Sequence, residues 1–177
     1  MGNLSEPRFK PLQLPRPDGR RVLVRECTEL DFEALVAMYK SFQPKRVVQS
    51  LPPSGVPRIA HWLVQLQLKS RCLLALEGDR VVAHAILHPL SETQADLVVF
   101  VHQDYRRRGL GLAVSSLAVE LARQAGLSEL LLTTEVSNRA AIGLYRKLGF
   151  EISRESDGEC AMRLEVSGAR REERSAA

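Results

Sequence analysis

Cysteine is scarce in this chain of 177 residues, and its placement excludes two classes of protein. Cys27, Cys72 and Cys160 are odd in number and widely spaced, so they form neither a disulfide scaffold nor a CxxC metal or redox motif. We expect all three to be small core residues. The four histidines show no zinc-ligand spacing, and the sequence therefore predicts no metal site.

Long apolar runs are also missing. No stretch approaches the roughly 20 apolar residues of a membrane-spanning helix. The first residues lack the charged and then apolar pattern of a secretory signal. These two absences predict a cytoplasmic protein with no membrane partner.

Aromatic residues make up only 5% of the chain, and the positive charge is concentrated at its ends. The net charge is +4, but residues 1–21 carry five Lys or Arg against two acids, and residues 168–177 carry three Arg against two Glu. Residues 22–167 are therefore neutral overall. With neither a basic face nor a base-stacking surface, the sequence predicts no nucleic-acid partner.

The chain divides into one domain and two flanking segments. Residues 1–18 contain four prolines and no apolar period, which is typical of an extended or disordered arm. Residues 168–177 are expected to be a disordered tail. The domain of 19–167 is long enough to bury a core without a disulfide or metal.

Within the domain, alternating and helical apolar patterns predict a mixed α/β fold. The expected strands are 21–27, 71–76, 80–88, 96–101, 130–134, 150–153 and 160–166. The expected helices are 28–42, 57–69, 109–125 and 138–148, and residues 43–56 are expected to be a loop.

The most informative segment is Arg106-Arg-Arg-Gly109-Leu-Gly111, between an expected strand and helix. Backbone N–H groups at such a junction converge on one space, and the helix N-terminus adds positive potential, so the turn suits phosphate or pyrophosphate. No P-loop motif is present, and the dinucleotide fingerprint GxGxxG fails where Val114 replaces its third glycine. A glycine turn that only packs the helix against the sheet is the alternative.

Here the chain resembles the GNAT superfamily of acetyl-CoA-dependent N-acyltransferases. The family's phosphate motif, Gln/Arg-x-x-Gly-x-Gly/Ala, is met at Arg106–Gly111, and the segment Asn138–Phe150 is similar to its second cofactor motif. The resemblance implies a GNAT-like mixed, mostly antiparallel sheet of six to seven strands, flanked by about four helices. It also implies that the fourth strand, 96–101, splays from the fifth, 130–134, and such a splay would need a β-bulge.

The resemblance further implies where acetyl-CoA binds. The pyrophosphate would lie on the turn, the pantetheine arm would pair with the backbone of the fourth strand, and Asn138 would contact the pantetheine. The cofactor-binding residues implied are Val99, Phe100, Val101, Arg106, Arg107, Arg108, Gly109, Leu110, Gly111 and Asn138. For Asn138, the alternative is a simple helix N-cap.

Two catalytic residues follow from the same resemblance. Tyr145 lies two helical turns from Asn138 and would protonate the departing thiolate, with half-buried packing as the alternative. Asp96 on the fourth strand would accept the proton of the amine, directly or through water. Glu92 and Glu135 are the other acidic candidates. Relatives that acetylate protein N-termini often carry a base where this chain has Thr133.

The acceptor is expected to be a primary amine, either a protein lysine or a small molecule. The opening segment, Leu14–Arg25 followed by Thr28–Glu33, resembles the start of bacterial acetyltransferase domains fused to acyl-CoA synthetase-like modules, some of which acetylate protein lysines. The alternative function is a non-catalytic acyl-CoA-binding sensor or interaction module. A homodimer is left open as a partner state.

Overall fold

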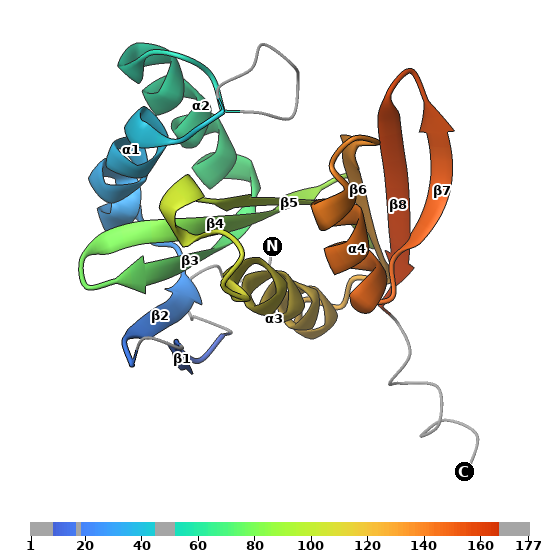
Figure 1. The fold of residues 1–177 in the computed structure, drawn as a ribbon, viewed down its shortest axis with the longest axis horizontal. Coiled ribbons are helices and arrows are strands. Elements are labelled where there is room, and N and C mark those ends of the chain that lie inside the picture. The colour runs from blue at the N-terminus through green and yellow to red at the C-terminus, as the bar shows by residue number, and fades with distance from the viewer. Residues whose placement is uncertain (1–8, 17–18, 45–51, 167–177) are drawn as a thin grey trace.

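The computed structural model describes residues 9–16, 19–44 and 52–166. Its centre is one eight-stranded sheet in the order β1-β2-β3-β4-β5-β6-β8-β7 (Figure 1). All neighbouring strands are antiparallel except β5 and β6, which are parallel. The strands are β1 Leu12–Pro15, β2 Arg21–Glu26, β3 Arg71–Glu77, β4 Arg80–Pro89, β5 Gln94–Val101, β6 Glu129–Glu135, β7 Glu151–Ser156 and β8 Glu159–Glu165.

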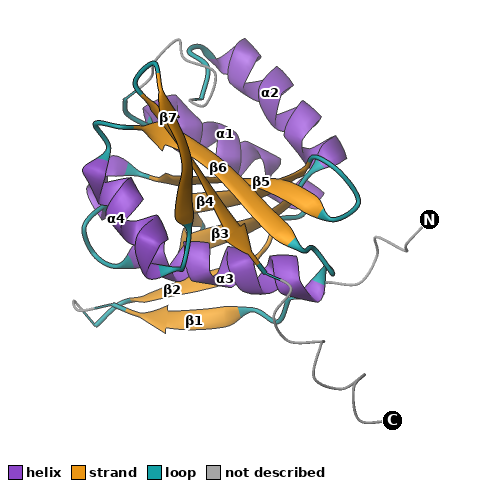
Figure 2. Ribbon diagram, turned by 90° about the vertical axis from the view of Figure 1, so that its right-hand side faces the viewer, coloured by secondary structure: helices purple, strands orange, loops and turns teal. Residues whose placement is uncertain are grey.

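Two helices cover each face of the sheet (Figure 2). On one side lie α1, Phe32–Ser41, and α2, Val56–Lys69; on the other lie α3, Leu110–Gln124, and α4, Arg139–Lys147. Each pair encloses its own cluster of buried side chains, so the molecule has one core on each face of the sheet. The four predicted helices and the mixed, mostly antiparallel sheet are confirmed.

The strand count differs from the prediction by one. Within the expected arm of residues 1–18, Leu12–Pro15 pairs with Arg21–Val24, and Phe9 is buried against the core. Prolines 11 and 15 are compatible with this because β1 is an edge strand, where a missing N–H costs little. The remaining parts of the arm, residues 1–8 and 17–18, and the predicted tail of 168–177 lie outside the described residues.

The parallel pairing of β5 with β6 is short. It joins Gln94–Asp96 to Glu129–Leu131, and beyond these three residue pairs the strands diverge (Figure 1). On its other edge β5 stays in continuous register with β4, from Ala83↔Val101 to Pro89↔Ala95. The splay is therefore present, and the expected bulge in this strand is not. The different directions taken by β5 and β6 separate them.

Candidate active site

The glycine turn is built as an anion-binding junction. It leaves the short 3-10 turn Gln103–Tyr105 and enters α3 at Leu110, with Arg107 and Gly109 in the left-handed region at φ 58° and 77°. The first helical hydrogen bond runs from Ala113 N to Gly109 O, 3.1 Å, so the N–H groups of residues 110–112 have no partner within the helix. Residues 106–109 are exposed, and the open donors can meet an anion.

Arg106 anchors this turn with its side chain. Its Nε donates to Val101 O at 2.9 Å, and its guanidinium also donates to Gln43 O and lies 5.3 Å over the ring of Phe42. Burial in this position lowers the pKa of Arg106 from its ordinary value. The guanidinium therefore ties the end of β5 to the end of α1, and the anion-binding groups of the turn are its backbone N–H groups.

The free edge of β5 begins where β6 diverges. His102 N donates to Val82 O at 2.9 Å on the β4 side. Because backbone groups alternate along a strand, those of Val99 and Val101 point to the opposite side, toward the divergence. The backbone of Phe100 points to β4 instead, so of the three predicted backbone contacts only Val99 and Val101 are oriented for a ligand there. Val101 O is already used by Arg106.

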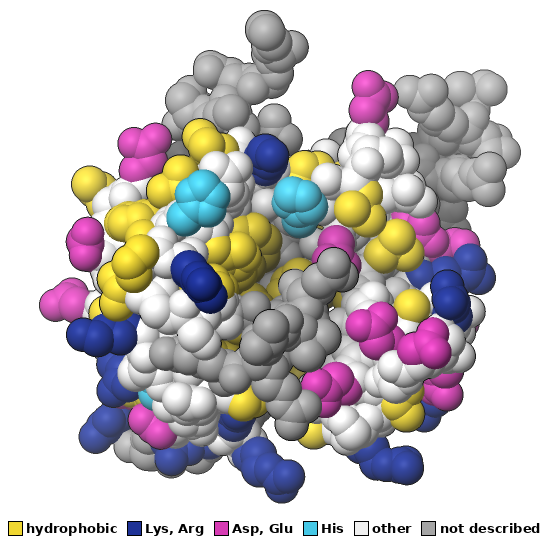
Figure 3. Space-filling model, turned by 90° about the horizontal axis from the view of Figure 1, so that it is seen from above, with side chains coloured by type: hydrophobic (Ala, Val, Ile, Leu, Met, Phe, Trp, Pro, Cys, Tyr) yellow, Lys and Arg dark blue, Asp and Glu magenta, His cyan; other side chains and the backbone are white. Residues whose placement is uncertain are grey.

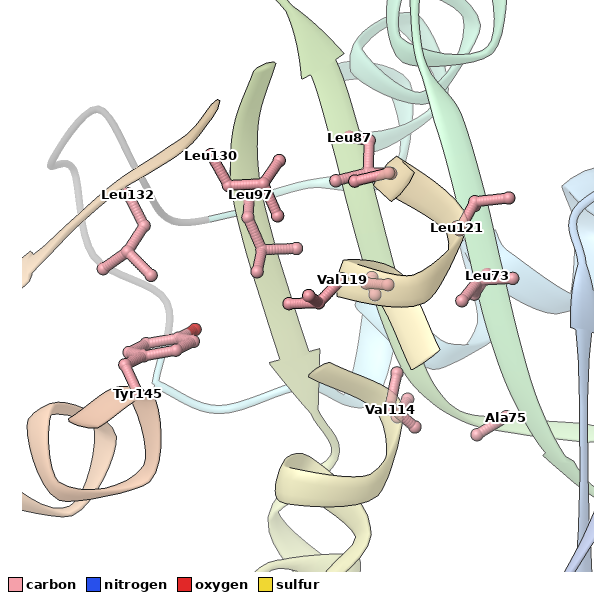
Figure 4. Close-up of a cluster of buried hydrophobic side chains, with 14 of the residues drawn as sticks. Leu73, Ala75, Leu87, Leu97, Val114, Val119, Leu121, Leu130, Leu132 and Tyr145 are labelled. Atoms are coloured by element: carbon pink, nitrogen blue, oxygen red, sulfur yellow. The ribbon is translucent and has the colours of Figure 1, made fainter. Parts of the chain in front are cut away.

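Tyr145 points from α4 into the divergence, toward Leu97 of β5 and Leu132 of β6 (Figure 4). Its ring packs against Phe150 with centroids 5.5 Å apart, and its side chain is almost fully buried. Burial, with a smaller contribution from the charge of Asp96, raises the pKa of Tyr145 to about 12. At neutral pH the hydroxyl is protonated and able to donate.

Asp96 lies at the last paired position of β5 and is half-buried. Burial raises its pKa, and the neighbouring His88 acts in the opposite direction. The charge of Asp96 contributes to the raised pKa of Tyr145, so the two residues, 49 positions apart in the sequence, interact electrostatically. A candidate proton acceptor on β5 and a candidate proton donor on α4 therefore both border the divergence.

His88 belongs to this site and was not predicted. It is the cross-strand partner of Asp96, and its Nδ1 lies 2.9 Å from the hydroxyl of Ser70 at the end of α2. The four-residue spacing between His84 and His88 indicates that both lie on one face of a strand. The spacing does not report the partners of His88, because Ser70 and Asp96 belong to other segments of the chain. His84 lies deeper and is fully buried, with Nδ1 2.7 Å from the Tyr39 hydroxyl.

Three other residues that the sequence singled out, Asn138, Glu92 and Glu135, lie at different places in the structure. Asn138 is the N-cap of α4, accepting from Ala141 N at 3.2 Å, and its amide nitrogen lies 3.3 Å from Thr134 Oγ1. Glu92 is exposed in the turn before β5, whereas Glu135 is half-buried at the end of β6 and accepts from Ser137 Oγ.

The surface on this side of the molecule is hollowed between the α1–α2 side and the β6–β8 side (Figure 3). Hydrophobic side chains gather in the hollow, and histidine side chains lie beside it. On the face of the sheet that α1 and α2 cover, Tyr39 makes edge-on contacts with Trp62 and Phe100, at ring-centroid distances of 5.0 and 5.6 Å.

Two further properties concern the part of the chain that the structure describes. Among residues 9–16, 19–44 and 52–166, no three His, Cys, Asp or Glu side chains are grouped closely enough to hold a metal ion. Over the same residues, no helix is long and apolar enough to cross a membrane.

Comparison with known proteins matches this chain to acetyltransferases. The family model described as Acetyltransferase (GNAT) family matches residues 32–150. The L-methionine sulfoximine/L-methionine sulfone acetyltransferase of Pseudomonas aeruginosa is 46% identical over 55 residues, covering 31% of this chain and 32% of that protein. The mycothiol acetyltransferase of Corynebacterium glutamicum is 32% identical over 143 residues, covering 77% and 48%. The chain thus matches between a third and a half of the length of these relatives.

Solved structures agree in fold. The GNAT domain of S. lividans PAT superposes with a TM-score of 0.75 at 18% identity, covering 88% of this chain and 96% of that one. The putative acetyltransferase yncA of Salmonella typhimurium, solved with its cofactor acetyl-CoA, gives 0.68 at 19% identity, covering 83% and 95%. At these identities the likeness concerns the fold alone.

Proposed function

Since the chain belongs to the GNAT family of acetyltransferases, we propose that it transfers an acetyl group from acetyl-CoA to a primary amine. The observation that carries the proposal is the meeting of three features at the divergence of β5 and β6. These are the open N–H groups of the glycine turn, the free backbone edge of Val99, and the Tyr145–Asp96 pair.

The described residues fit acetyl-CoA. Backbone N–H groups from Arg107 to Leu112 would hold the pyrophosphate, while the side chain of Arg106 is tethered to Val101 O and Gln43 O. The Val99 N–H would bind the pantetheine arm or polarise the thioester carbonyl. Asn138 caps α4 and has a further N–H available for the pantetheine. Bound there, the thioester supplies an activated acetyl group.

The chain's own residues would move two protons. A lysine-like amine has a pKa of about 10.4 and is mostly protonated at neutral pH, so it must lose a proton before it attacks. Asp96 accepts that proton, directly or through one water, and its raised pKa makes it a better acceptor than an exposed aspartate. As the C–N bond forms and the C–S bond breaks, Tyr145 donates its proton to the departing sulfur.

His88 would position this acceptor. Ser70 fixes the imidazole through Nδ1, and the imidazole stands beside Asp96 across the β4–β5 ladder. The interaction with His88 lowers the pKa of Asp96 and so favours its charged form, which is the form that accepts a proton.

The acceptor is proposed only as a class. The relatives named above are, by their names, an acetyltransferase of L-methionine sulfoximine and L-methionine sulfone and a mycothiol acetyltransferase. A further relative, the ribosomal protein bS18-alanine N-acetyltransferase of Escherichia coli, is 32% identical over 74 residues, covering 42% of this chain and 50% of that protein. Thr133, exposed on β6, cannot act as a base, which speaks against a protein N-terminus as the acceptor. We infer a protein lysine or a small amine.

Thiol release from acetyl-CoA with a panel of amines and lysine peptides tests the function. Acetyl-CoA binding together with turnover of at least one amine supports the proposal. Tight binding without turnover across the panel would instead indicate an acyl-CoA-binding sensor, and absence of binding would overturn both functions.

A further inference from the structure

Two half-buried cysteines face one another at the two ends of the segment that carries α1 and α2. Cys27 follows β2, and Cys72 lies in β3. Cys27 N donates to Cys72 O at 2.9 Å, continuing the antiparallel register that ends at Glu26↔Leu73. The sequence predicted core residues, which holds for the fully buried Cys160 and is wrong for this pair.

The register brings the two thiols together. Directly opposed residues of neighbouring strands project to the same face of a sheet. In a hydrogen-bonded antiparallel pair the Cα atoms are about 5.5 Å apart, and disulfides span about 4.4–6.8 Å between Cα atoms. Both side chains pack beside the α1–α2 core, and both remain partly open to solvent.

We propose that Cys27 and Cys72 form an oxidisable dithiol, a modification site at which hydrogen peroxide joins the two thiols in a disulfide. Nothing in the acetyltransferase chemistry requires it. The Cys27 thiolate attacks one peroxide oxygen, which gives a sulfenic acid on Cys27 and a hydroxide ion that takes up a proton. The Cys72 sulfur then attacks the Cys27 sulfur; the S–S bond forms, the S–O bond breaks, and the hydroxyl leaves as water with the Cys72 proton. Two electrons pass from the two sulfurs to the peroxide, which becomes two waters.

The surroundings assign different roles to the two sulfurs. Hydrogen bonding from the Cys72 thiol lowers the pKa of Cys27, and the nearby Arg25 acts in the same direction, whereas the pKa of Cys72 is raised. Cys27 is therefore the attacking thiolate and Cys72 the resolving thiol. Gln67 of α2 lies beside Cys27, and its Nε2 is buried without a hydrogen-bond partner among the described residues, so a donor is available to the oxidised sulfur.

The position gives the cross-link a structural consequence. The segment between the two cysteines, 28–71, contains α1 and α2, which lie together on one face of the sheet (Figures 1 and 2). A disulfide at its two ends closes this whole segment into a covalent loop. Closing a long loop restricts the unfolded chain and stabilises the native one.

The test treats the reduced full-length chain with hydrogen peroxide, blocks remaining thiols by alkylation and maps the cysteines by mass spectrometry. The expected product is a Cys27–Cys72 peptide lighter by two hydrogen atoms, with Cys160 alkylated, and a melting temperature above that of the reduced chain. Cys160→Ser should behave as the wild type does, whereas Cys27→Ser and Cys72→Ser should give no intramolecular cross-link.

Three results would overturn the proposal. They are alkylation of both Cys27 and Cys72 after peroxide, accumulation of sulfinic acid on Cys27 with Cys72 still free, and disulfides only between separate chains. The wild-type mapping does not depend on the folding of any variant, and none of these readouts depends on acetyl transfer.

Discussion

Gly111 and Leu144 lie against one another where α3 meets α4. A Cβ built on Gly111 would stand 3.2 Å from Leu144 Cδ1 and 3.6 Å from Val101 Cγ2. The second glycine of the turn thus allows α3 to approach α4 and β5 closely. These contacts support the packing interpretation of this glycine, and its role in anion binding stays a prediction.

Gly111→Val, combined with a change at Leu144, separates the contribution of Gly111 to packing from its contribution to acetyl-CoA binding. The valine should weaken acetyl-CoA binding at least tenfold, about 1.4 kcal/mol, and overpacking should lower the free energy of unfolding by about 1–3 kcal/mol. Adding Leu144→Ala should restore stability without restoring affinity. Calorimetric titration and denaturant unfolding measure the two quantities. Recovery of both by the second substitution would show that Gly111 acts through packing alone.

Asp96→Asn tests the proton acceptor. Turnover should fall by roughly 10²–10⁴-fold, the usual contribution of a general base. In the wild type, activity should be lost as the pH falls through the pKa of Asp96, which burial places above the ordinary value, and the asparagine variant should lack that acidic limb. Glu92→Gln, which removes an exposed carboxylate from the preceding turn, is the matched control. An unaltered pH–rate profile in Asp96→Asn would assign the proton to Glu135 or to solvent.

His88→Gln and Ser70→Ala test the positioning of that acceptor. Both should shift the acidic limb of kcat to higher pH, since a positive neighbour that lowers the pKa of Asp96 is lost or displaced. The affinity for acetyl-CoA should stay within a few-fold of wild type. A purely structural role for His88 would lower the melting temperature and leave the position of the limb unchanged.

Tyr145→Phe keeps the ring against Phe150 and removes only the hydroxyl. Because a thiol with a pKa of about 8.5 is a fair leaving group even as the thiolate, the loss of turnover should be modest, on the order of 10²-fold. Steady-state kinetics with thiol detection, beside a melting curve, measures it. Tyr105→Phe, which removes a hydroxyl that donates to Glu77, is the control for loss of a core hydroxyl. Full activity in Tyr145→Phe would leave that residue with a packing role.

His84 makes stability depend on pH. Burial lowers the pKa of His84 to about 3, whereas an unfolded histidine binds a proton below about 6.5. The unfolded state therefore binds more protons between these values, and the free energy of unfolding should fall by up to about 1.4 kcal/mol for each unit of pH decrease in that window. Denaturant titrations at several pH values check the slope. The double variant Tyr39→Phe/His84→Leu replaces both partners of the buried hydrogen bond, and its slope should be smaller; an equal slope would assign the effect to other groups.

The sequence predicted the elements around the glycine turn well because their signals are local. Gly109 and Gly126 mark the two ends of α3, and Asn138 caps α4 as its residue type indicates. Periodicity also assigned seven of the eight strands. The edge strand β1 was missed because its prolines, a local breaker signal, are offset by the burial of Phe9 in the core, which is a tertiary contact.

The site was only partly predictable. The resemblance implied catalytic roles for Asp96 and Tyr145, and these roles stay predictions, whereas the place where β5 and β6 diverge beside them depends on strand pairing. The pairing of Ser70 with His88 joins the end of a helix to the end of a strand 18 residues later, and no periodicity reports it. The Cys27–Cys72 pair likewise depends on the β2–β3 register, which connects segments on either side of two helices.

Three residue pairs join β5 to β6, and the sheet therefore consists of two parts of unequal size, β1 to β5 and β6 to β8. Neighbouring strands within each part pair over four to seven residues, whereas β5 and β6 pair over three. The backbone amides of Val99 and Val101, which point toward the divergence, should therefore exchange readily with deuterium in the free protein. A ligand that lies along the divergence would slow that exchange and would link the two parts of the sheet where their strands no longer pair.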